Sequence, residues 1–302
     1  DANLIGIIYQ KTTKDYNNSK ISEVKNYFDT LPLGKISLGN VTREENWISG
    51  TTYATINRVF NNLGLPVSET DPLGHVTTYM YDSMNLYTVS VTNAAQQVTS
   101  YEYDYRFGQV VKTIDPNGAI SKISLDALGR SVKEEYSDPA QTLPTSLFTK
   151  KIVSYDLYSQ NGGVVGWKTV ETNFLDETTT TLPRTNKSIT YTDGFGRTVQ
   201  TRTQAEAVIG ATSERYTAVD TIYNNIGQVA KTSLPYFSDN DVRTIANADQ
   251  RLFVSLSYDS VYRVVSTTNV IGNSTNNYDD WKVTTTDANG KIKSLYKDAF
   301  DK

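Results

Sequence analysis

The chain has 302 residues, a length that suits two domains or one repeat array. Its 29 basic and 33 acidic residues give a formal net charge of −4 with no clustered basic stripe, which argues against nucleic-acid binding. The absence of cysteine excludes a disulfide framework and any cysteine-based zinc or redox site. No stretch approaches the roughly 18 apolar residues of a transmembrane helix. Frequent Thr, Ser and Val with 21 tyrosines predict an all-β protein.

Residues 1–58 are expected to form irregular N-terminal repeats. An apolar run predicts a strand at Leu4–Gln10, and the polar stretch Lys11–Lys20 predicts a loop. A first aromatic–aspartate turn begins at Tyr27–Asp29. The segment Val41–Trp47 starts a strand pair that ends near Phe60.

Residues 59–136 repeat with a regular period. Rows that begin at Tyr81, Tyr103 and Leu125 are 22 residues apart, and such a period indicates a repeat architecture. About six to eight residues remain between turns, which is the length of a short strand. The pattern therefore predicts tandem antiparallel β-hairpins. Their turn residues recur every 10 to 12 positions, at Gly64, Gly74, Asn85, Gln96, Gly108, Gly118 and Gly129.

Two turns have the sequence Asp-Pro-x-Gly. They are Asp71-Pro72-Leu73-Gly74 and Asp115-Pro116-Asn117-Gly118. Proline fixes φ near −65°, glycine supplies a positive φ, and the aspartate carboxylate can accept a backbone N–H two residues on. These residues are therefore predicted to serve the turns.

Side chains alternate between two faces in the predicted strands Val76–Tyr81, Val98–Tyr103 and Ile120–Leu125. The even period keeps equivalent residues on one face. If consecutive rows stack, two ladders are predicted, one of Tyr79, Tyr101 and Ile123 and the other of Tyr81, Tyr103 and Leu125.

From residue 137 to 302 the repeats continue with inserted loops, predicted at 137–150, 176–188 and 204–216, the second including Asn186. Asn161-Gly162-Gly163 predicts a hairpin turn between strands Lys151–Tyr158 and Val164–Phe174. No composition break marks a linker, so residues 1–302 are predicted to be one repeat segment, which we expect to be a piece of a longer chain. The turn motif returns at Tyr191–Val199, Tyr223–Val229, Tyr258–Val265 and Asp287–Gly290.

Tandem motifs such as Asp126–Arg130 (DALGR), Tyr191–Arg197 (YTDGFGR) and Tyr223–Gln228 (YNNIGQ), which alternate with Asp-Pro-x-Gly turns, resemble the YD or Rhs repeats. These repeats occur in bacterial polymorphic toxins, in the B subunit of Tc toxin complexes, in wall-associated proteins and in teneurins. The resemblance runs from about Tyr27 to Lys302, with Tyr262 and Asp301 at positions where the motif has glycine. The residues assigned to the structural repeat motif are Tyr81, Asp82, Tyr103, Asp104, Asp126, Gly129, Arg130, Tyr191, Gly196, Arg197, Tyr223, Gly227, Tyr258 and Asp259.

The resemblance implies a β-hairpin strip that curves or spirals into a hollow shell, which in toxin relatives encloses an inactive cargo. The function that the resemblance implies is a structural shell segment of a secreted bacterial protein, which encapsulates or scaffolds a toxin component without catalytic turnover. The expected partners are the rest of its own shell, an enclosed toxin domain or toxin-complex subunits, with no cofactor, nucleic acid or membrane span. The alternative is an extracellular adhesion module that binds cell-surface glycans.

Other residues could carry chemistry, but each has a simpler interpretation. The sole histidine, His75, follows a turn, and the adjacent pairs Glu44-Glu45 and Glu134-Glu135 point to opposite faces of a strand. One aspartate per turn, as at Asp287, gives too few oxygen ligands for calcium. No catalytic or metal-binding set is therefore predicted. The aromatic candidates for glycan stacking are Trp47, Trp167 and Trp281, which share no repeat position.

Overall fold

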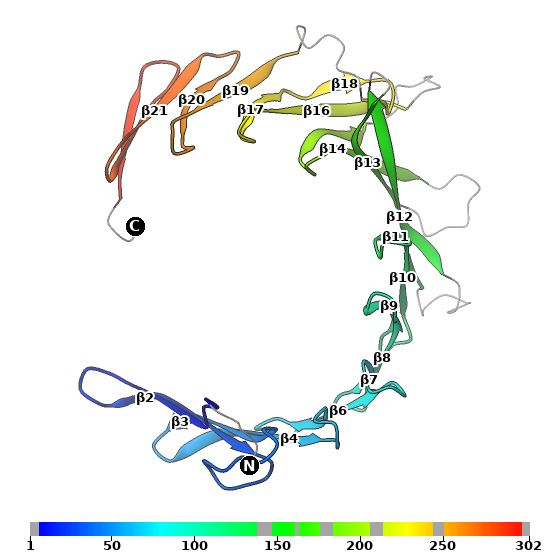
Figure 1. The fold of residues 1–302 in the computed structure, drawn as a ribbon, viewed down its shortest axis with the longest axis vertical. Helices are drawn as coiled ribbons and strands as arrows, with labels where there is room; N and C mark the ends of the chain where they lie inside the picture. The colour runs from blue at the N-terminus through cyan, green and yellow to red at the C-terminus, as the bar shows by residue number, and fades with distance from the viewer. Residues whose placement is uncertain are drawn as a thin grey trace. The chain divides into compact units, whose positions relative to one another are not determined.

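The computed structural model describes residues 6–137, 147–160, 163–175, 184–205, 214–243 and 251–297. Within these ranges the regular elements are β-strands, and each pairs antiparallel with a strand close to it in sequence (Figure 1). The predicted all-β fold of tandem antiparallel hairpins is confirmed. The chain divides into two compact units, Asp1–Arg130 with Glu134–Phe148, and Ser131–Lys133 with Thr149–Lys302.

The strands of the first unit are short and follow one another as a meander. Each 22-residue row of the sequence supplies two strands and two turns, which is why hydrogen bonding proceeds in chain order. The strands are β1 (Gln10–Lys14), β2 (Lys20–Phe28), β3 (Val41–Ser49), β4 (Thr52–Phe60), β5 (Pro66–Thr70), β6 (Val76–Tyr81), β7 (Thr88–Thr92), β8 (Val98–Asp104), β9 (Gln109–Ile114) and β10 (Ile120–Leu125). Strand β11 (Ser131–Tyr136) has residues in both units.

The second unit begins with longer strands. They are β12 (Phe148–Gln160), β13 (Gly163–Phe174), β14 (Thr185–Asp193), β15 (Thr198–Gln204) and β16 (Tyr216–Tyr223). One departure from the meander follows, because β16 pairs with β17 (Val229–Ser233) through one half of its length and with β18 (Tyr236–Ser238) through the other. The meander then continues through β19 (Phe253–Tyr258), β20 (Val264–Thr268), β21 (Asn273–Asp279), β22 (Lys282–Thr286) and β23 (Ile292–Tyr296).

The N-terminal prediction was wrong. Residues 6–9 of the predicted strand Leu4–Gln10 are not strand, and residues 1–5 lie outside the described residues. The strand β1 instead occupies the first part of the predicted loop Lys11–Lys20, and Gln10 pairs with Lys25 of β2. Pairing with the neighbouring strand decides this, since the β1 side chains are polar and exposed and give no hydropathy signal.

The inserted loops are shorter than predicted. Strand β12 begins at Phe148, β14 at Thr185 and β16 at Tyr216, so the ends of the predicted loops are strand. Asn186 is not a loop residue, because it pairs with Asn173 across β13 and β14. The predicted pairing of the segments on either side of Asn161-Gly162-Gly163 is confirmed, although Asn161 and Gly162 lie outside the described residues.

The strip has two edges of different character. Since antiparallel strands reverse direction at each turn, the turns after β4, β6, β8 and β10 lie on one edge of the first unit, and those after β14, β16, β19 and β21 on one edge of the second. In each unit, we call the edge that carries these turns the YD edge. The opposite edge has the connections β11–β12, β13–β14, β15–β16 and β18–β19. Each of these four connections contains an internal stretch of more than two residues that lies outside the described residues.

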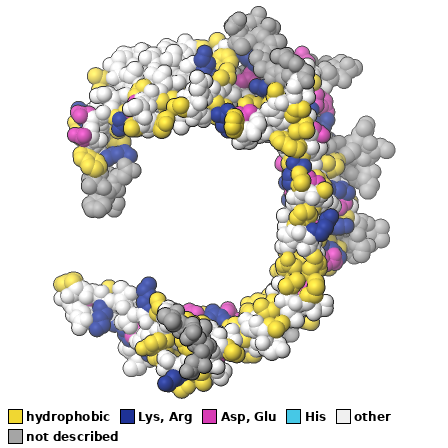
Figure 2. Space-filling view, viewed as in Figure 1, with side chains coloured by type: hydrophobic (Ala, Val, Ile, Leu, Met, Phe, Trp, Pro, Cys, Tyr) yellow, Lys and Arg dark blue, Asp and Glu magenta, His cyan; other side chains and the backbone are white. Residues whose placement is uncertain are grey.

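Few side chains are fully buried, as expected for a sheet that is mostly one layer thick. In the described residues, the buried apolar side chains are Phe28, Val153, Ile189, Tyr191, Tyr216 and Ala218, and three of them form one cluster in the second unit. On the face seen in Figure 2, apolar side chains are scattered among polar ones. Stability must therefore come from contacts between neighbouring hairpins, as in other repeat proteins.

The predicted tyrosine ladders are not formed by direct contact. Strand β7 lies between β6 and β8, so Tyr79 pairs with Val91 while Tyr101 pairs with Thr113. Equivalent residues are two strands apart, about 10 Å, because each row contributes two strands. The ring contacts that do form in this region join Tyr87 to Tyr103, with centroids 4.5 Å apart, and to Tyr105.

The described residues contain no helix of the length and hydropathy needed to cross a bilayer.

The turn glycines give the first testable prediction. Gly118 and Gly129 have φ of +85° and +79°, where a side chain is strained. Gly118→Val should therefore destabilise the protein by about 1–3 kcal/mol. Gly129→Val should cost more, because its Cβ would lie 2.8 Å from Cδ1 of Phe107. Denaturant unfolding measures both.

The matched control is Gly194→Val in the turn after β14. Gly194 lies outside the left-handed region and has open space around its Cβ position. Its substitution should change stability by less than either variant above. An equal free energy of unfolding for all three variants would contradict the assigned turn conformations.

Candidate functional site

The recurrent structural site of the chain is the turn itself. In the turn from Asp126, one carboxylate oxygen accepts the backbone N–H groups of Leu128 and Arg130, both at 2.9 Å. The backbone closes the same turn, with Asp126 N–H donating to the carbonyl of Arg130 and Gly129 N–H to that of Asp126. The first turn residue therefore acts as a cap for the second and fourth residues after it.

The same cap recurs on both edges of the strip. It is made by aspartate or asparagine, because both side chains place an acceptor oxygen at the required position. The capping residues with this spacing are Asp15, Asn61, Asp71, Asn93, Asp115, Asp126, Asp193, Asn224, Asp259 and Asp287. At Asp82 and Asp104 the turns differ, since Asp82 binds the N–H of Leu86 and Asp104 that of Arg106.

An arginine four residues after the cap extends several turns on the YD edge toward the next hairpin. Arg197 donates from Nε to Asp193 at 2.8 Å, and its guanidinium lies 4.6 Å from the ring centroid of Tyr223. Arg263 repeats this arrangement with Asp259 at 2.7 Å and with Tyr278 at 4.3 Å. The arginine thus joins its own turn to the tyrosine of the following row.

The row tyrosine makes a second link, to the backbone. At the YD turns after β4, β6, β14, β16 and β19 the strand register shifts, which offers the carbonyl of the first residue of the returning strand to a new donor. The tyrosine hydroxyl of the next row donates to that carbonyl. The pairs are Tyr81 to Pro66 (2.8 Å), Tyr103 to Thr88 (3.1 Å), Tyr155 to Ser131 (3.3 Å), Tyr223 to Thr198 (2.9 Å), Tyr258 to Val229 (2.8 Å) and Tyr278 to Val264 (3.0 Å).

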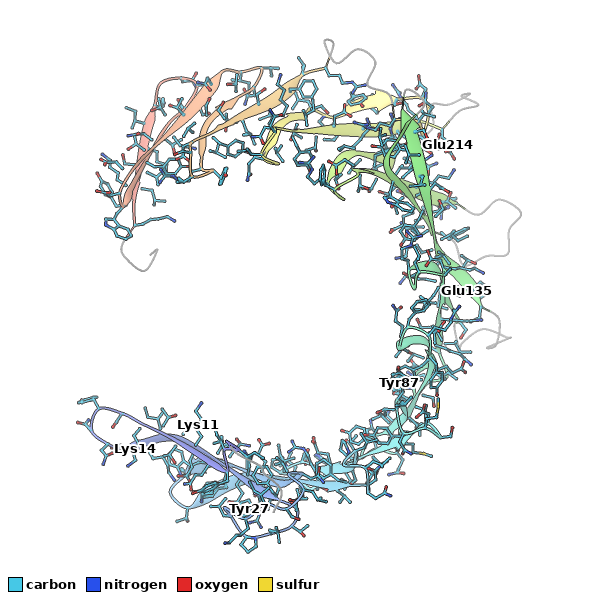
Figure 3. All side chains as sticks on the ribbon, viewed as in Figure 1. Lys11, Lys14, Tyr27, Tyr87, Glu135 and Glu214 are labelled. Atoms are coloured by element: carbon cyan, nitrogen blue, oxygen red, sulfur yellow. The ribbon has the colours of Figure 1, made fainter. Side chains whose placement is uncertain are left out.

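Tyr87, labelled in Figure 3, shows how aromatic residues pack near this edge in the first unit. Its ring stacks on Tyr103 and meets Tyr105 edge-on at 5.5 Å. Tyr105 donates its hydroxyl to Asp82 at 2.5 Å, which ties two successive YD turns together.

The second unit contains a buried polar cluster on β15 and β16. Arg202 is fully buried, and its Nε donates to Gln200 at 2.7 Å. Gln200 in turn donates to Asp220 at 2.5 Å and to the hydroxyl of Tyr236 at 3.1 Å. Asp220 also forms an ion pair with Arg251. Burial raises the pKa of Tyr236 to about 12, so this phenol stays protonated near neutral pH.

Residues 236–243 cover this cluster. Arg202 donates to the Ser238 hydroxyl at 2.8 Å and to the carbonyl of Asn240 at 2.5 Å. Lys168 of β13 binds Asp241 at 2.6 Å, and the Tyr191 hydroxyl donates to the Asp241 carbonyl. The buried cations and phenols therefore attach a covering segment to the sheet.

A cleft of about 360 Å³ lies beside this cluster. Its apolar lining includes Val199, Ile222 and Phe253. The carboxylates of Asp193 and Asp220 line it as well, but each is held by an arginine, Arg197 or Arg251. The charged groups of the cleft thus serve the repeat motif and the polar cluster, and no general acid–base pair is poised there.

The first unit has its own buried carboxylate, Glu23 of β2. Tyr53 donates its hydroxyl to Glu23 at 2.5 Å, Thr12 donates at 3.1 Å, and Lys25 lies 3.3 Å away. These hydrogen bonds, that from Tyr53 foremost, lower the pKa of Glu23 to about 2. The carboxylate is ionised and already bound, which is the arrangement of a structural ion pair.

The candidate catalytic residues are dispersed. His75 is exposed, and its Nδ1 lies 2.8 Å from the turn residue Asp71. Glu44 binds Arg58 and Asn46, whereas Glu45 accepts from Tyr27, so the two carboxylates have separate partners. In the described part of the chain, no group of three His, Asp or Glu side chains is arranged to hold a metal ion.

The three tryptophans lie on different hairpins. Trp47 donates its Nε1–H to the carbonyl of Gly50 at 2.9 Å and has Lys20 over its ring at 4.8 Å. Trp167 is in β13, and Trp281 is in the turn after β21. No common aromatic platform for a glycan follows from these positions.

Sequence reasoning missed the buried cluster of Gln200, Arg202 and Asp220. These polar residues alternate along β15 and β16 as though they faced solvent, but β18 binds Gln200 and Arg202, and Arg251 pairs with Asp220. Their spacing of two residues along the strand was the available signal, since it places Gln200 and Arg202 on one face.

The turn caps predict acid sensitivity. The backbone N–H of Arg130 lowers the pKa of Asp126 more than any other group does, and that of Arg263 acts likewise on Asp259. A carboxyl whose folded pKa is lowered adds stability above its unfolded pKa of about 4, and this is lost as the pH falls through the lower folded pKa. Asp126→Asn should keep the cap, as Asn224 does, and weaken the acid dependence.

Denaturant unfolding between about pH 2 and pH 6 measures this effect, with the pH window set by ordinary carboxyl titration. Asn224→Asp is the reciprocal control and should strengthen the acid dependence. An unchanged pH profile for both variants would show that the caps do not contribute through their charge.

The sequence of residues 165–291, less than half of the chain, matches the family model described as a domain of unknown function, DUF6443. No curated protein matches the chain.

Several solved structures share its fold. The crystal structure of TcdB2-TccC3 matches 90% of this chain at 17% identity with a TM-score of 0.68, and the match covers 18% of that chain. TcdB2-TccC3-Cdc42 matches 90% at 16% identity and a TM-score of 0.67, covering 20% of that chain. TcdB2-TccC3 without its hypervariable C-terminal region matches 90% at 16% identity and 0.64, again over 20% of that chain.

The present chain thus spans about a fifth of the length of these structures. The shared fold confirms the resemblance to Rhs/YD-repeat proteins that the turn motifs indicated. The chain is an antiparallel strip of β-hairpins with the fold of the TcdB2-TccC3 structures.

Proposed function

We propose that this chain is a wall segment of an Rhs-type shell, which encapsulates or scaffolds a toxin component and has no catalytic turnover of its own. The observation that carries the proposal is the link from a tyrosine hydroxyl to the backbone of the preceding hairpin, which recurs at six tyrosines. A link that recurs between neighbouring hairpins lets a strip lengthen without a larger core, and an extended strip is what a wall requires.

The chemistry of the described residues supports a structural role. The turn carboxylates accept backbone N–H groups, and several also bind arginine, so they are occupied by the fold. The buried polar cluster attaches a segment of the chain to the sheet. A catalytic site needs groups that remain available to a substrate, and neither set has this property.

The shared fold supports the remaining parts of the proposal. TcdB2-TccC3 is a Tc toxin protein that contains Rhs repeats. By analogy, the partners of this chain would be further repeats of the same wall and an enclosed toxin domain, and the assembly would be secreted. The enclosed part would correspond to a variable region, such as the hypervariable C-terminal region named for TcdB2-TccC3.

Electron microscopy of the natural full-length protein tests this function. We expect a closed wall around a cavity, with density for the enclosed component inside it. A particle without a cavity, or a flat open array, would rule out the shell. Limited proteolysis is a second test of the same function, because an enclosed component should be cleaved only after the wall is denatured.

A further inference from the structure

The YD edge carries a row of exposed apolar side chains. In seven described YD turns, the residue just before the left-handed turn position is apolar. We call these the tip residues. They are Leu63, Met84, Phe107 and Leu128 in the first unit and Phe195, Ile226 and Val261 in the second.

These side chains are unusually exposed. Apart from Phe107, at 36%, the tip residues are between 58% and 87% exposed. The turn does not require an apolar residue there, since this position accepts most side chains. The corresponding position on the opposite edge is mixed, with Leu73, Ala95, Asn117, Ile271 and Asn289. Apolar residues thus occur at this position on both edges, but on the YD edge they recur in seven turns, and such a row of exposed apolar side chains indicates a contact outside the strip.

The spacing of the tips defines what could cover them. Successive YD turns are two strands apart, so the tips recur about every 10 Å along the edge of each unit. A partner must offer apolar surface with the same period. A second run of YD repeats meets this condition, because its own tips have the same spacing and fall between those of the first.

One contact within the chain shows that a tip and a YD turn fit together. The ring of Phe107 lies on the turn of the next row, so close to Gly129 that an added Cβ would come within 2.8 Å of Cδ1. Gln109 of the same hairpin donates to the carbonyl of Gly129 at 3.2 Å. An apolar tip seated on a turn glycine is therefore a contact that this edge already makes.

The charges of the edge argue against a lipid surface as the partner. The turns carry the carboxylates of Asp82, Asp104, Asp126, Asp193 and Asp259. Arg106, Arg130, Arg197 and Arg263 are each bound to the aspartate of their own turn. Membrane-binding edges of this kind normally combine apolar tips with lysine or arginine that can reach anionic headgroups.

We propose that the YD edge is a seam, in which the tip residues pack against the YD edge of a second run of the same repeats. The proposal deepens the shell function and rests on it for the presence of that second run. The seam would close the wall between adjacent runs by apolar contact, without pairing the strands themselves.

Single cysteines test the seam, because the chain contains none of its own. Leu128→Cys and Phe195→Cys place a thiol at a tip in each unit, and Leu73→Cys and Ile271→Cys are controls on the opposite edge. The controls replace residues that are 81% and 82% exposed. In the natural full-length protein, the tip thiols should react with a maleimide about tenfold more slowly than the controls, since they must first be uncovered.

A photoactivatable benzophenone maleimide on the same thiols then identifies the covering surface. Crosslinked peptides read by mass spectrometry should join a tip to another stretch of YD repeats. Labelling as fast as the controls, or crosslinks confined to lipid or to a protein without such repeats, would overturn the seam. Ile226→Cys replaces any tip variant whose melting temperature differs from that of the parent protein.

The outcomes separate the seam from the shell. Freely labelled tips in a particle that electron microscopy shows to be closed would refute the seam and leave the shell standing. Protected tips crosslinked to repeats in an open array would refute the shell and keep the seam.

Discussion

The hydrogen bond from a tyrosine hydroxyl to a carbonyl of the preceding hairpin, which recurs at six tyrosines, is the interaction on which the rest of this structure depends. A register shift at the YD turn makes that carbonyl available, and the Asp or Asn cap fixes the turn that causes the shift. At two of these turns the arginine after the cap, Arg197 or Arg263, lies against the tyrosine that makes the link. Turn, strand register and contact between rows are thus parts of one repeating device.

This device explains how a sheet with a small buried core remains ordered. Each hairpin is held by its neighbours, so the strip can lengthen without a larger core. The second unit adds a local exception, in which Arg202 and Asp220 attach a returning segment to β15 and β16. The tyrosine links of the described residues lie at the YD edge, whereas the connections β11–β12, β13–β14, β15–β16 and β18–β19 join strands at the opposite edge.

Much of the fold could be predicted from sequence because turn residues are local. The spacing of Gly64, Gly74 and Gly108 located the hairpins, and Asp71 and Asp115 are caps as their chemistry suggested. The strand β1 could not be predicted, since its polar residues are ordered only by pairing with β2. The tyrosine links were also missed, because they depend on a register shift that the period of 22 residues does not reveal.

The free energy of unfolding of Tyr223→Phe tests this account most directly. The variant keeps the ring against Arg197 and removes only the hydroxyl that donates to Thr198. Tyr16→Phe is the matched control, because Tyr16 is 96% exposed. We predict a loss of about 0.5–1.5 kcal/mol for Tyr223→Phe, the usual contribution of one such hydrogen bond, and no change for the control. Equal stability of the two variants would contradict the claim that the tyrosine link holds successive rows together.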